Sequence, residues 1–242
     1  MNTIARTLAL TAGLIASSAW ATPAQTLFFT QSTLASLPGA MVWGTGGSSC
    51  QDPRTDVVGL CGAALNFNTA AGPLRVTGGD GGHADTLAHV FQGASSTGLG
   101  VVEGEVKGSS FKVTDHNYSL DTSKETLTLS FASSINLSQL YFFSDDRTNT
   151  LKELDKFDGF SISVNGGSWQ DFTFGNNAGL PVSLNLTGST FTLGYARKNS
   201  VEDYFLAGMS YTAVTPAIPE PGTWAFMALG LLGLGWVARR RA

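Results

Sequence analysis

Charged residues are scarce in this chain, and those of positive sign are the scarcest. The 242 residues include 14 lysines and arginines, 18 aspartates and glutamates, and three histidines. Four of the arginines, Arg6 and Arg239 to Arg241, lie near the chain ends, so the part between them has 10 basic against 18 acidic residues, a net charge of about −8. A domain that binds nucleic acid needs a basic face. The composition therefore argues against nucleic acid as a partner.

Cysteine is also nearly absent, which excludes a disulfide-dense scaffold and a cysteine-rich metal cluster. The two cysteines, Cys50 and Cys61, lack C-x-x-C spacing and have no histidine near them in sequence, so no metal site is expected there. In an oxidising compartment two thiols this close usually form a disulfide, which would contribute roughly 3 kcal/mol for a loop of this length. A pair of free thiols is the alternative.

Motifs for nucleophilic catalysis are missing as well. The sequence has no G-x-S-x-G elbow, and His83, His89 and His116 have no recognisable serine or cysteine partner. Paired carboxylates for glycoside hydrolysis remain open, because their separation depends on the tertiary structure and no pair stands out. We therefore expect no enzymatic activity, with a secreted hydrolase as one alternative.

Two acidic or glycine-rich segments could be considered for calcium. The run from Gly78 to His83 resembles the calcium-binding nonapeptide repeat, but it occurs once and has His83 where the repeat has Asp, so a glycine-rich loop is favoured. Possible oxygen donors also gather near His116, without EF-hand spacing, at Asp115, Asn117, Asp121, Glu125, Asp145 and Asp146. No cofactor is expected, and a structural calcium ion is the alternative to solvated loop acids.

Alternating apolar and polar residues are what the chain has in abundance. Strands are predicted at Thr26–Thr30, Ala64–Asn68, Leu99–Val106, Glu125–Phe131, Ser138–Phe143, Gly159–Val164, Trp169–Phe174, Val182–Leu186, Phe191–Tyr195 and Phe205–Tyr211. Asn165-Gly166 is a hairpin-turn sequence. One helix-like stretch is expected over Asp85–Gln92. Many short strands with 29 glycines and little charge predict an all-β fold, an antiparallel jelly-roll-like sandwich.

Aromatic residues could form an exposed platform that stacks on sugar rings. The candidates lie in or beside predicted strands, and they are Trp43, Tyr141, Trp169, Tyr195, Tyr204 and Tyr211. At such positions packing in the core is the usual outcome, so we expect most of them to be buried. Trp169, next to the polar turn Asn165–Ser168, is expected to be the most exposed.

The N-terminus has the features of a secretory signal peptide over residues 1–21. Arg6 precedes an apolar segment from Leu8 to Ile15, and Ala19-Trp20-Ala21 gives the small-x-small pattern that signal peptidase cleaves. We expect an ectodomain over residues 22–214 after cleavage. The apolar segment is too short for an uncleaved membrane anchor.

The C-terminus combines a proline-rich stalk, an apolar run and a basic end. Residues 215–221 contain three prolines and should be extended, and residues 222–242 should form a transmembrane helix and its tail. The uncharged run from Trp224 to Ala238 would be roughly 22 Å long as a helix, so it needs the flanking arginines to snorkel to the headgroups. The arginines Arg239, Arg240 and Arg241 should stay cytoplasmic, which places the ectodomain across the membrane.

This tail resembles the PEP-CTERM sorting region of Gram-negative bacteria. The resemblance rests on Pro219, Glu220 and Pro221, on Gly222, on the glycine-spaced apolar run and on the terminal arginines, with Ile218 where the family usually has Val. It implies export, a membrane-anchored precursor, and cutting near the motif by the membrane protease exosortase, followed by release or transfer at the cell surface. An uncut membrane anchor is the alternative.

Together these features predict an exported protein that exosortase sorts to the cell surface or the extracellular matrix. Its expected partners are signal peptidase, exosortase and, before processing, the membrane. The expected role of the ectodomain is structural or adhesive. A carbohydrate-binding module that acts on exopolysaccharide is the first alternative, and an exposed coplanar pair of aromatic rings would favour it.

Overall fold

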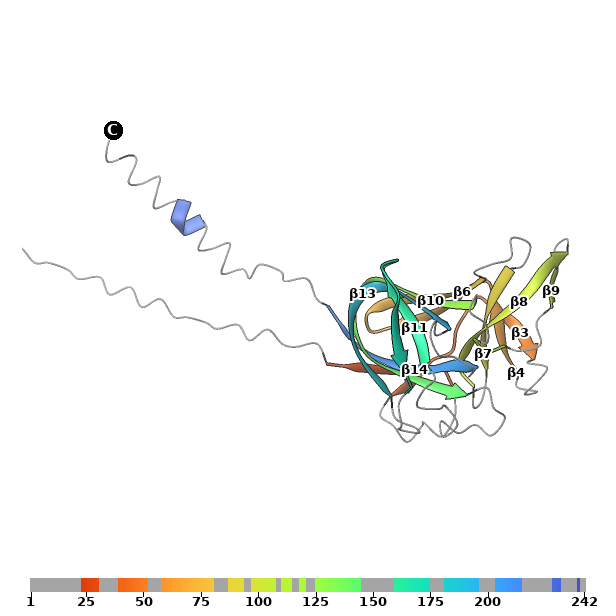
Figure 1. Cartoon of the computed structure of the whole chain (residues 1–242). Coiled ribbons are helices and arrows are strands. Elements are labelled where there is room, and N and C mark those ends of the chain that lie inside the picture. The colour runs from red at the N-terminus through yellow and green to blue at the C-terminus, as the bar shows by residue number, and fades with distance from the viewer. Residues whose placement is uncertain are drawn as a thin grey trace, which may run out of the picture.

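The computed structural model describes residues 23–30, 39–51, 58–80, 87–93, 97–107, 110–114, 118–120, 125–144, 159–174, 181–195, 203–214, 228–231 and 239. Almost all of these residues lie in strands (Figure 1). The strands are β1 (Gln25–Phe28), β2 (Ala40–Met41), β3 (Ser48–Gln51), β4 (Val58–Gly62), β5 (Leu65–Thr69), β6 (Gly72–Asp80), β7 (Leu87–Gly93), β8 (Leu99–Lys107), β9 (Ser110–Val113), β10 (Glu125–Ser144), β11 (Gly159–Val164), β12 (Gln170–Thr173), β13 (Val182–Tyr195) and β14 (Tyr204–Ala213).

Hydrogen bonds connect all of these strands into one sheet. Its main order is β12-β11-β13-β10-β14-β8-β7-β4-β3, and β6, β5, β1, β2 and β9 pair with members of this path. The pairs are antiparallel except for the short parallel pair β1–β2. The predicted all-β, antiparallel class is therefore confirmed. The finer prediction of a jelly-roll-like sandwich is not, because the described strands form one continuous sheet.

Two strands are much longer than predicted. Residues Glu125–Phe131 and Ser138–Phe143 belong to one strand, β10, and the segments at Val182 and Phe191 likewise belong to β13. The register of the two strands shifts between Ser130 and Ile135, where the hydrogen-bonded partner of β10 on its other edge changes from β6 to β14. Such an irregularity bends a strand without ending it.

The sheet curves around the main apolar core. This core combines side chains from β5, β6, β7, β8, β10, β11, β13 and β14, including the fully buried Leu129, Phe191 and Tyr211. Aromatic rings are packed in series within it, and the centroids of Phe142 and Phe160 are 4.6 Å apart. Burial of each such ring contributes about 1.5–3 kcal/mol. A second, smaller cluster holds Phe28, Phe91, Val102, Tyr118, Tyr141, Phe143, Phe205 and Ala207.

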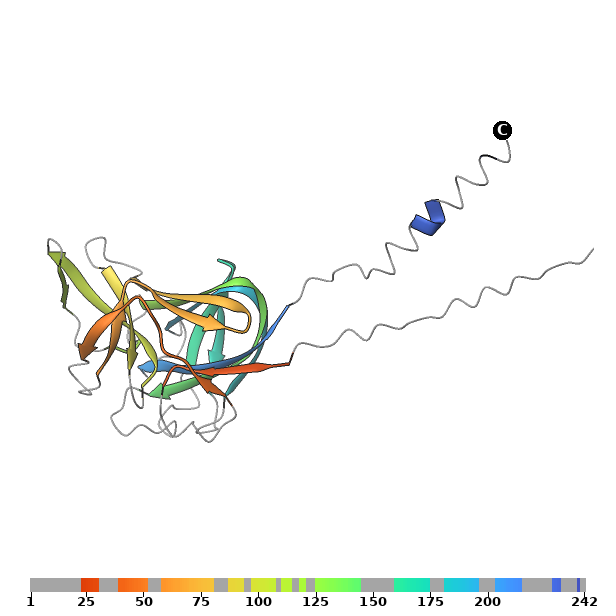
Figure 2. The same ribbon diagram turned by 180° about the vertical axis from the view of Figure 1, so that it is seen from behind.

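Strands β10, β11, β13 and β14 lie on one side of the domain, and β3, β4, β7, β8 and β9 lie on the other (Figures 1 and 2). The two sides meet where Leu99 of β8 pairs with Leu206 of β14. Gly98 makes this approach possible, because it has a φ of +157° and a Cβ there would collide with the carbonyl of Leu206.

The prediction of a helix over Asp85–Gln92 is wrong for its described part. Residues Leu87–Gly93 form β7, which pairs with β4 on one edge and β8 on the other. Hydrogen bonding on both edges outweighs the weak helical pattern. The predicted glycine-rich loop also begins later than expected, because Gly78 and Gly79 belong to β6. A Cβ on Gly78 would lie 3.0 Å from the carbonyl oxygen of His89 in the neighbouring β7.

The predicted hairpin turn between β11 and β12 is confirmed. Asn165 and Gly166 both have positive φ, +51° and +71°, as a two-residue hairpin turn with this sequence requires. The side-chain oxygen of Asn165 accepts hydrogen bonds from the backbone amides of Ser189 and Thr190, both at 3.0 Å. The turn is therefore attached to the bend of β13.

Candidate functional site

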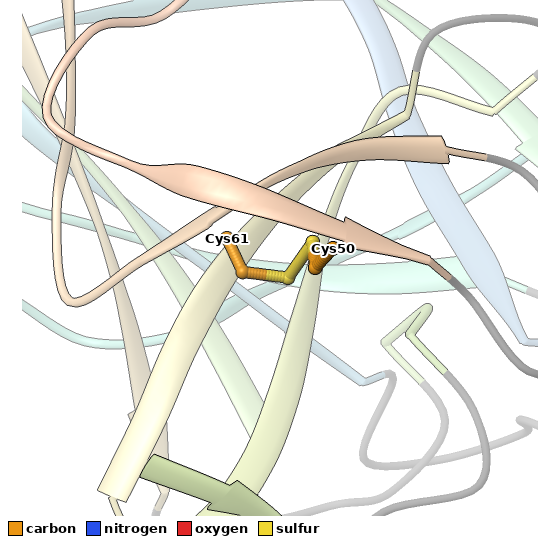
Figure 3. Close-up of a disulfide and its surroundings, with 2 residues drawn as sticks. All are labelled: Cys50 and Cys61. Carbon is orange, nitrogen blue, oxygen red and sulfur yellow. A yellow bond between two sulfur atoms is a disulfide. The ribbon is translucent and has the colours of Figure 1, made fainter. Parts of the chain in front are cut away.

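The predicted disulfide is confirmed. Cys50 of β3 and Cys61 of β4 form it, and their Cα atoms are 5.8 Å apart (Figure 3). Cys50 is registered opposite Gly59, and Cys61 opposite Ser48, so the bond runs diagonally between the two strands. Both half-buried cysteines pack against the smaller apolar cluster. The bond therefore ties the edge strand β3 to the rest of the sheet.

A buried glutamine organises the surface next to this edge. Gln92 of β7 is fully buried, and its side-chain amide donates hydrogen bonds to the carbonyls of Phe29 (3.1 Å) and Val42 (2.8 Å). Its side-chain oxygen accepts a hydrogen bond from the backbone amide of Gly44 at 2.8 Å. Sequence reasoning missed this residue, because a single polar residue in an apolar strand carries no local signal of its partners.

Trp43 lies between the two residues that Gln92 holds, and its side chain points to solvent. Its exposed fraction is 45 %, and that of Met41 two residues earlier is 37 %. Val42, between them, packs against the main core instead, so the side chains alternate beyond the end of β2 at Met41. Gln92 thus fixes the backbone on both sides of an exposed indole. This arrangement presents a flat apolar ring on a constrained support.

The other candidate aromatic residues are mostly buried, as predicted. Tyr141, Tyr204 and Tyr211 are at most 7 % exposed. The prediction that Trp169 is the most exposed is wrong, because Trp169 is half-buried and its ring lies over Gly194, where a Cβ would be 3.4 Å from two ring atoms. The side chain of Tyr195 is outside the described part. Among the described aromatic side chains, the exposed one is therefore Trp43.

The acidic and histidine candidates are only partly within the described residues. Glu125, the first residue of β10, is 1 % exposed and lies in register with Asp80 of β6. His89 of β7 is half-buried, and this burial lowers its pKa below the ordinary value of 6.5. Outside the described residues are Gly81, Gly82, His83, Asp115, His116, Asn117, Asp121, Asp145 and Asp146. Where side chains are described, no three His, Cys, Asp or Glu residues gather into a possible metal site.

The first strand of the domain begins next to the place where the last strand ends. Gln25, at the start of β1, is registered opposite Tyr211 near the end of β14. The backbone amide of Val214 donates a hydrogen bond to the carbonyl of Ser134, at the bend of β10 (3.1 Å). Figures 1 and 2 both show β1 and β14 reaching the same end of the domain. The last strand ends at Ala213, six residues before Pro219.

Most of the predicted processing signals lie outside the described residues. These are Ala19 and Ala21 at the signal cleavage site, Pro219, Glu220 and Pro221 of the sorting motif, and Arg240 and Arg241. Residues 228–231 and Arg239 are helical, and Leu229 and Leu231 are exposed. Within the described part of the chain, no helix has the length and hydropathy needed to cross a membrane.

The chain thus combines an all-β domain, with a disulfide in its edge hairpin β3–β4, and a C-terminal segment that follows the last strand. That segment, residues 217–241, matches the family model of the PEP-CTERM protein-sorting motif. The resemblance inferred from the sequence is confirmed over these residues, and the motif implies an exported protein with exosortase as its processing partner. No curated protein and no solved structure is significantly similar to the chain.

Proposed function

We propose that the chain is a structural or adhesive protein of the cell surface or extracellular matrix, cut by exosortase near Pro219-Glu220-Pro221 after an anchored stage. The sorting motif carries this proposal, because it marks the chain for the cell surface. The last strand ends six residues before Pro219, so a cut there leaves every described strand in the product.

The surface of the β domain supports an adhesive or structural role. Polar, uncharged side chains form hydrogen-bonded rows across neighbouring strands. Asn136 donates to Asn185 (2.8 Å) and Thr187 (3.1 Å), and the hydroxyls of Thr128 and Thr192 are 3.1 Å apart. Such a surface presents amide and hydroxyl groups that can exchange hydrogen bonds with a hydrated polysaccharide at little electrostatic cost.

Substitution of Glu220 tests the sorting part of the proposal. If exosortase recognises the Pro-Glu-Pro motif, Glu220→Ala should leave an uncut, membrane-bound precursor of higher mass, detected by immunoblotting of membrane and culture fractions. Glu153→Ala, which removes an acidic residue outside the motif, is the matched control and should be processed normally. Normal processing of Glu220→Ala, or of the unaltered chain in a host without exosortase, would contradict the proposal.

A carbohydrate-binding module is the second candidate function, and Trp43 favours it. An exposed indole whose backbone is held on both sides by Gln92 offers a preorganised apolar face for a sugar ring. A single ring stacks on a single sugar, so the expected affinity is low. Multivalent display at the cell surface would compensate for it.

A glycan array tests this second function. The processed protein, purified from the culture, is compared with Trp43→Ala and with the control Val58→Ala, which removes a different exposed apolar side chain. Binding that Trp43→Ala abolishes and Val58→Ala leaves intact supports a carbohydrate site at Trp43. Binding that is equal in all three proteins, or absent from the unaltered one, contradicts it.

A further inference from the structure

The end of the domain from which the chain leaves for the sorting motif has an unusual composition. We call it the chain-exit end and define it by the described residues 23–25, 68–73, 131–136, 164–168, 187–190 and 211–214. It contains the start of β1, the end of β14, the β5–β6 and β11–β12 turns, and the bends of β10 and β13.

Direct contacts place these segments together. A Cβ on Gly72, in the β5–β6 turn, would lie 3.6 Å from the Cβ of Ala132 in the bend of β10. Ile135 in that bend is registered opposite both Gly188 of β13 and Ala213 of β14. The β11–β12 turn is attached to the same bend of β13 through Asn165.

No residue of the chain-exit end is charged. Its exposed residues are mostly small or uncharged polar ones such as Ala70, Ser133, Ser134 and Ser168, together with the apolar Val214. The described part of the β domain has nine charged residues, and all lie elsewhere: Arg75, Asp80, Glu103, Glu105, Lys107, Lys112, Glu125, Asp171 and Asp203. Figure 1 shows β8 and β9, which carry four of them, on the side of the domain away from this end.

The opposite end of β14 shows the contrast. Asp203 immediately precedes β14, roughly 30 Å along the strand from Ala213 at about 3.3 Å per residue. Next to it, Ser144 is registered opposite Tyr204. Among the described residues, the domain therefore has an uncharged end, where the chain leaves, and a carboxylate, Asp203, at the opposite end of β14.

The length of chain outside the domain limits how it can sit on a membrane. Nine residues, Thr215 to Thr223, separate Val214 from the apolar run that begins at Trp224. Fully extended, they span about 30 Å at 3.3–3.6 Å per residue, which is no more than the length of β14. The charged end of β14 thus cannot reach the lipid without the tether being fully stretched, whereas the chain-exit end reaches it easily.

We propose that, in the uncut precursor, the chain-exit end rests on the lipid headgroups of a membrane with anionic lipids, with the charged end facing away. This inference depends on the proposed membrane-anchored stage of sorting. An anionic surface repels an acidic domain over about one Debye length, about 8–10 Å. A surface without carboxylates avoids this repulsion, and its backbone and hydroxyl groups can hydrogen-bond to headgroups. The sorting motif is then held next to the membrane, where its protease is embedded.

Fluorescence quenching by lipid headgroups tests the orientation. The full chain is reconstituted into vesicles of equal parts phosphatidylglycerol and phosphatidylcholine with a headgroup-attached quencher. The probe is a fluorophore on a single added cysteine, Ala70→Cys at the chain-exit end or Ala63→Cys seven residues earlier. Both alanines are exposed, and the native disulfide leaves only the added thiol to react. We expect severalfold stronger quenching at position 70.

A second experiment adds negative charge to the chain-exit end. The fluorophore is attached to Ser168→Cys, which lies at the same end. Ala70→Glu combined with Ser133→Glu should reduce quenching on phosphatidylglycerol-containing vesicles and leave it unchanged on pure phosphatidylcholine. Ala63→Glu, the matched control, should change neither. Equal quenching at positions 70 and 63, or no effect of the added glutamates on anionic vesicles, would overturn the orientation. A chain that does not float with vesicles at all would overturn the membrane-anchored stage and the orientation with it.

Discussion

At the scale of single residues, Gln92 shows how one buried polar side chain can organise a surface. It donates hydrogen bonds to the carbonyls of Phe29 and Val42 and accepts one from the backbone amide of Gly44. Each of the three hydrogen bonds has a small net energy. A buried polar group left without a partner, however, costs about 1–3 kcal/mol, so removing the bonds should destabilise the domain by more than their net energy.

We predict that Gln92→Leu lowers the free energy of unfolding by about 2–4 kcal/mol, because it leaves three buried backbone groups without partners. Chemical denaturation of the exported domain measures this change. The control is Gln170→Leu on the edge strand β12, where the side chain is exposed, and it should be close to neutral. Equal effects of the two substitutions would show that the hydrogen bonds of Gln92 do not contribute to the free energy of unfolding.

His89 predicts how stability depends on pH. Burial lowers the pKa of this histidine in the folded state, so the unfolded state binds a proton more readily. The folded state is therefore favoured above pH 6.5, and this advantage is lost as the pH falls below 6.5 toward the lower folded-state pKa. Thermal unfolding should show Tm falling over this range, and the His89→Gln variant should show a smaller fall. An identical pH dependence in the variant would rule out His89 as the cause.

At the scale of elements, the disulfide explains how the edge of the sheet is held. Strand β3 has mostly exposed side chains, and its pairing within the described residues is with β4. Few apolar contacts thus hold it, and the covalent bond between Cys50 and Cys61 restricts the separation of this hairpin. For a loop of this length the loop-entropy model gives a stabilisation of roughly 3 kcal/mol, the middle of the usual range.

We predict that Cys61→Ser lowers the free energy of unfolding by roughly 2–4 kcal/mol, because the unfolded chain regains the entropy of the open loop. The double variant Cys50→Ser/Cys61→Ser should lose a similar amount, since the second substitution removes no further bond. Denaturation of purified exported protein measures both. Two thiols that react with an alkylating agent in the native exported protein would contradict this account.

The long strands β10 and β13 show what could not be predicted about the elements: each was predicted as two strands. Their apolar halves are evident from alternation, but Ala132–Ser134 and Thr187–Ser189 have the composition of turns. In the structure the backbone continues through both segments, because the residues on either side of each bend stay paired: Ser130 with Thr190, and Ile135 with both Gly188 and Ala213. A bend and a turn use the same residues, so only the neighbouring strands distinguish them.

At the scale of the whole molecule, the folded domain and the sorting segment occupy different parts of the chain. The strands extend from Gln25 to Ala213, and the matched sorting motif begins at residue 217. The last strand, β14, pairs with β1, β8 and β10, so the folded domain depends on it and not on the tail. Sorting and folding are therefore expected to be separable by truncation.

We predict that a chain ending at Val214 is exported as a soluble, folded domain with a β-type circular dichroism spectrum. A chain ending at Asp203 is the control. It lacks β14 and should fail to fold, because β1 and β10 lose a central partner.

Deletion of the whole protein should alter matrix cohesion or cell aggregation and not growth. A helical spectrum, or a hydrolytic activity that one Asp or Glu substitution abolishes, would contradict the proposed non-enzymatic β domain.

The sequence by itself determined the all-β class, strands such as β11, the hairpin at Asn165-Gly166, the disulfide partners and the sorting motif. Each of these depends on residues close together in the chain, such as the alternation of Phe160, Ile162 and Val164 in β11. Only the tertiary structure decided that the strands join in one sheet, that β7 is not a helix, and that Trp43 and not Trp169 is exposed. It also brought the uncharged turns and bends together beside the start of β1 and the end of β14. These features depend on pairing between distant strands, and that information is not contained in any short segment of the sequence.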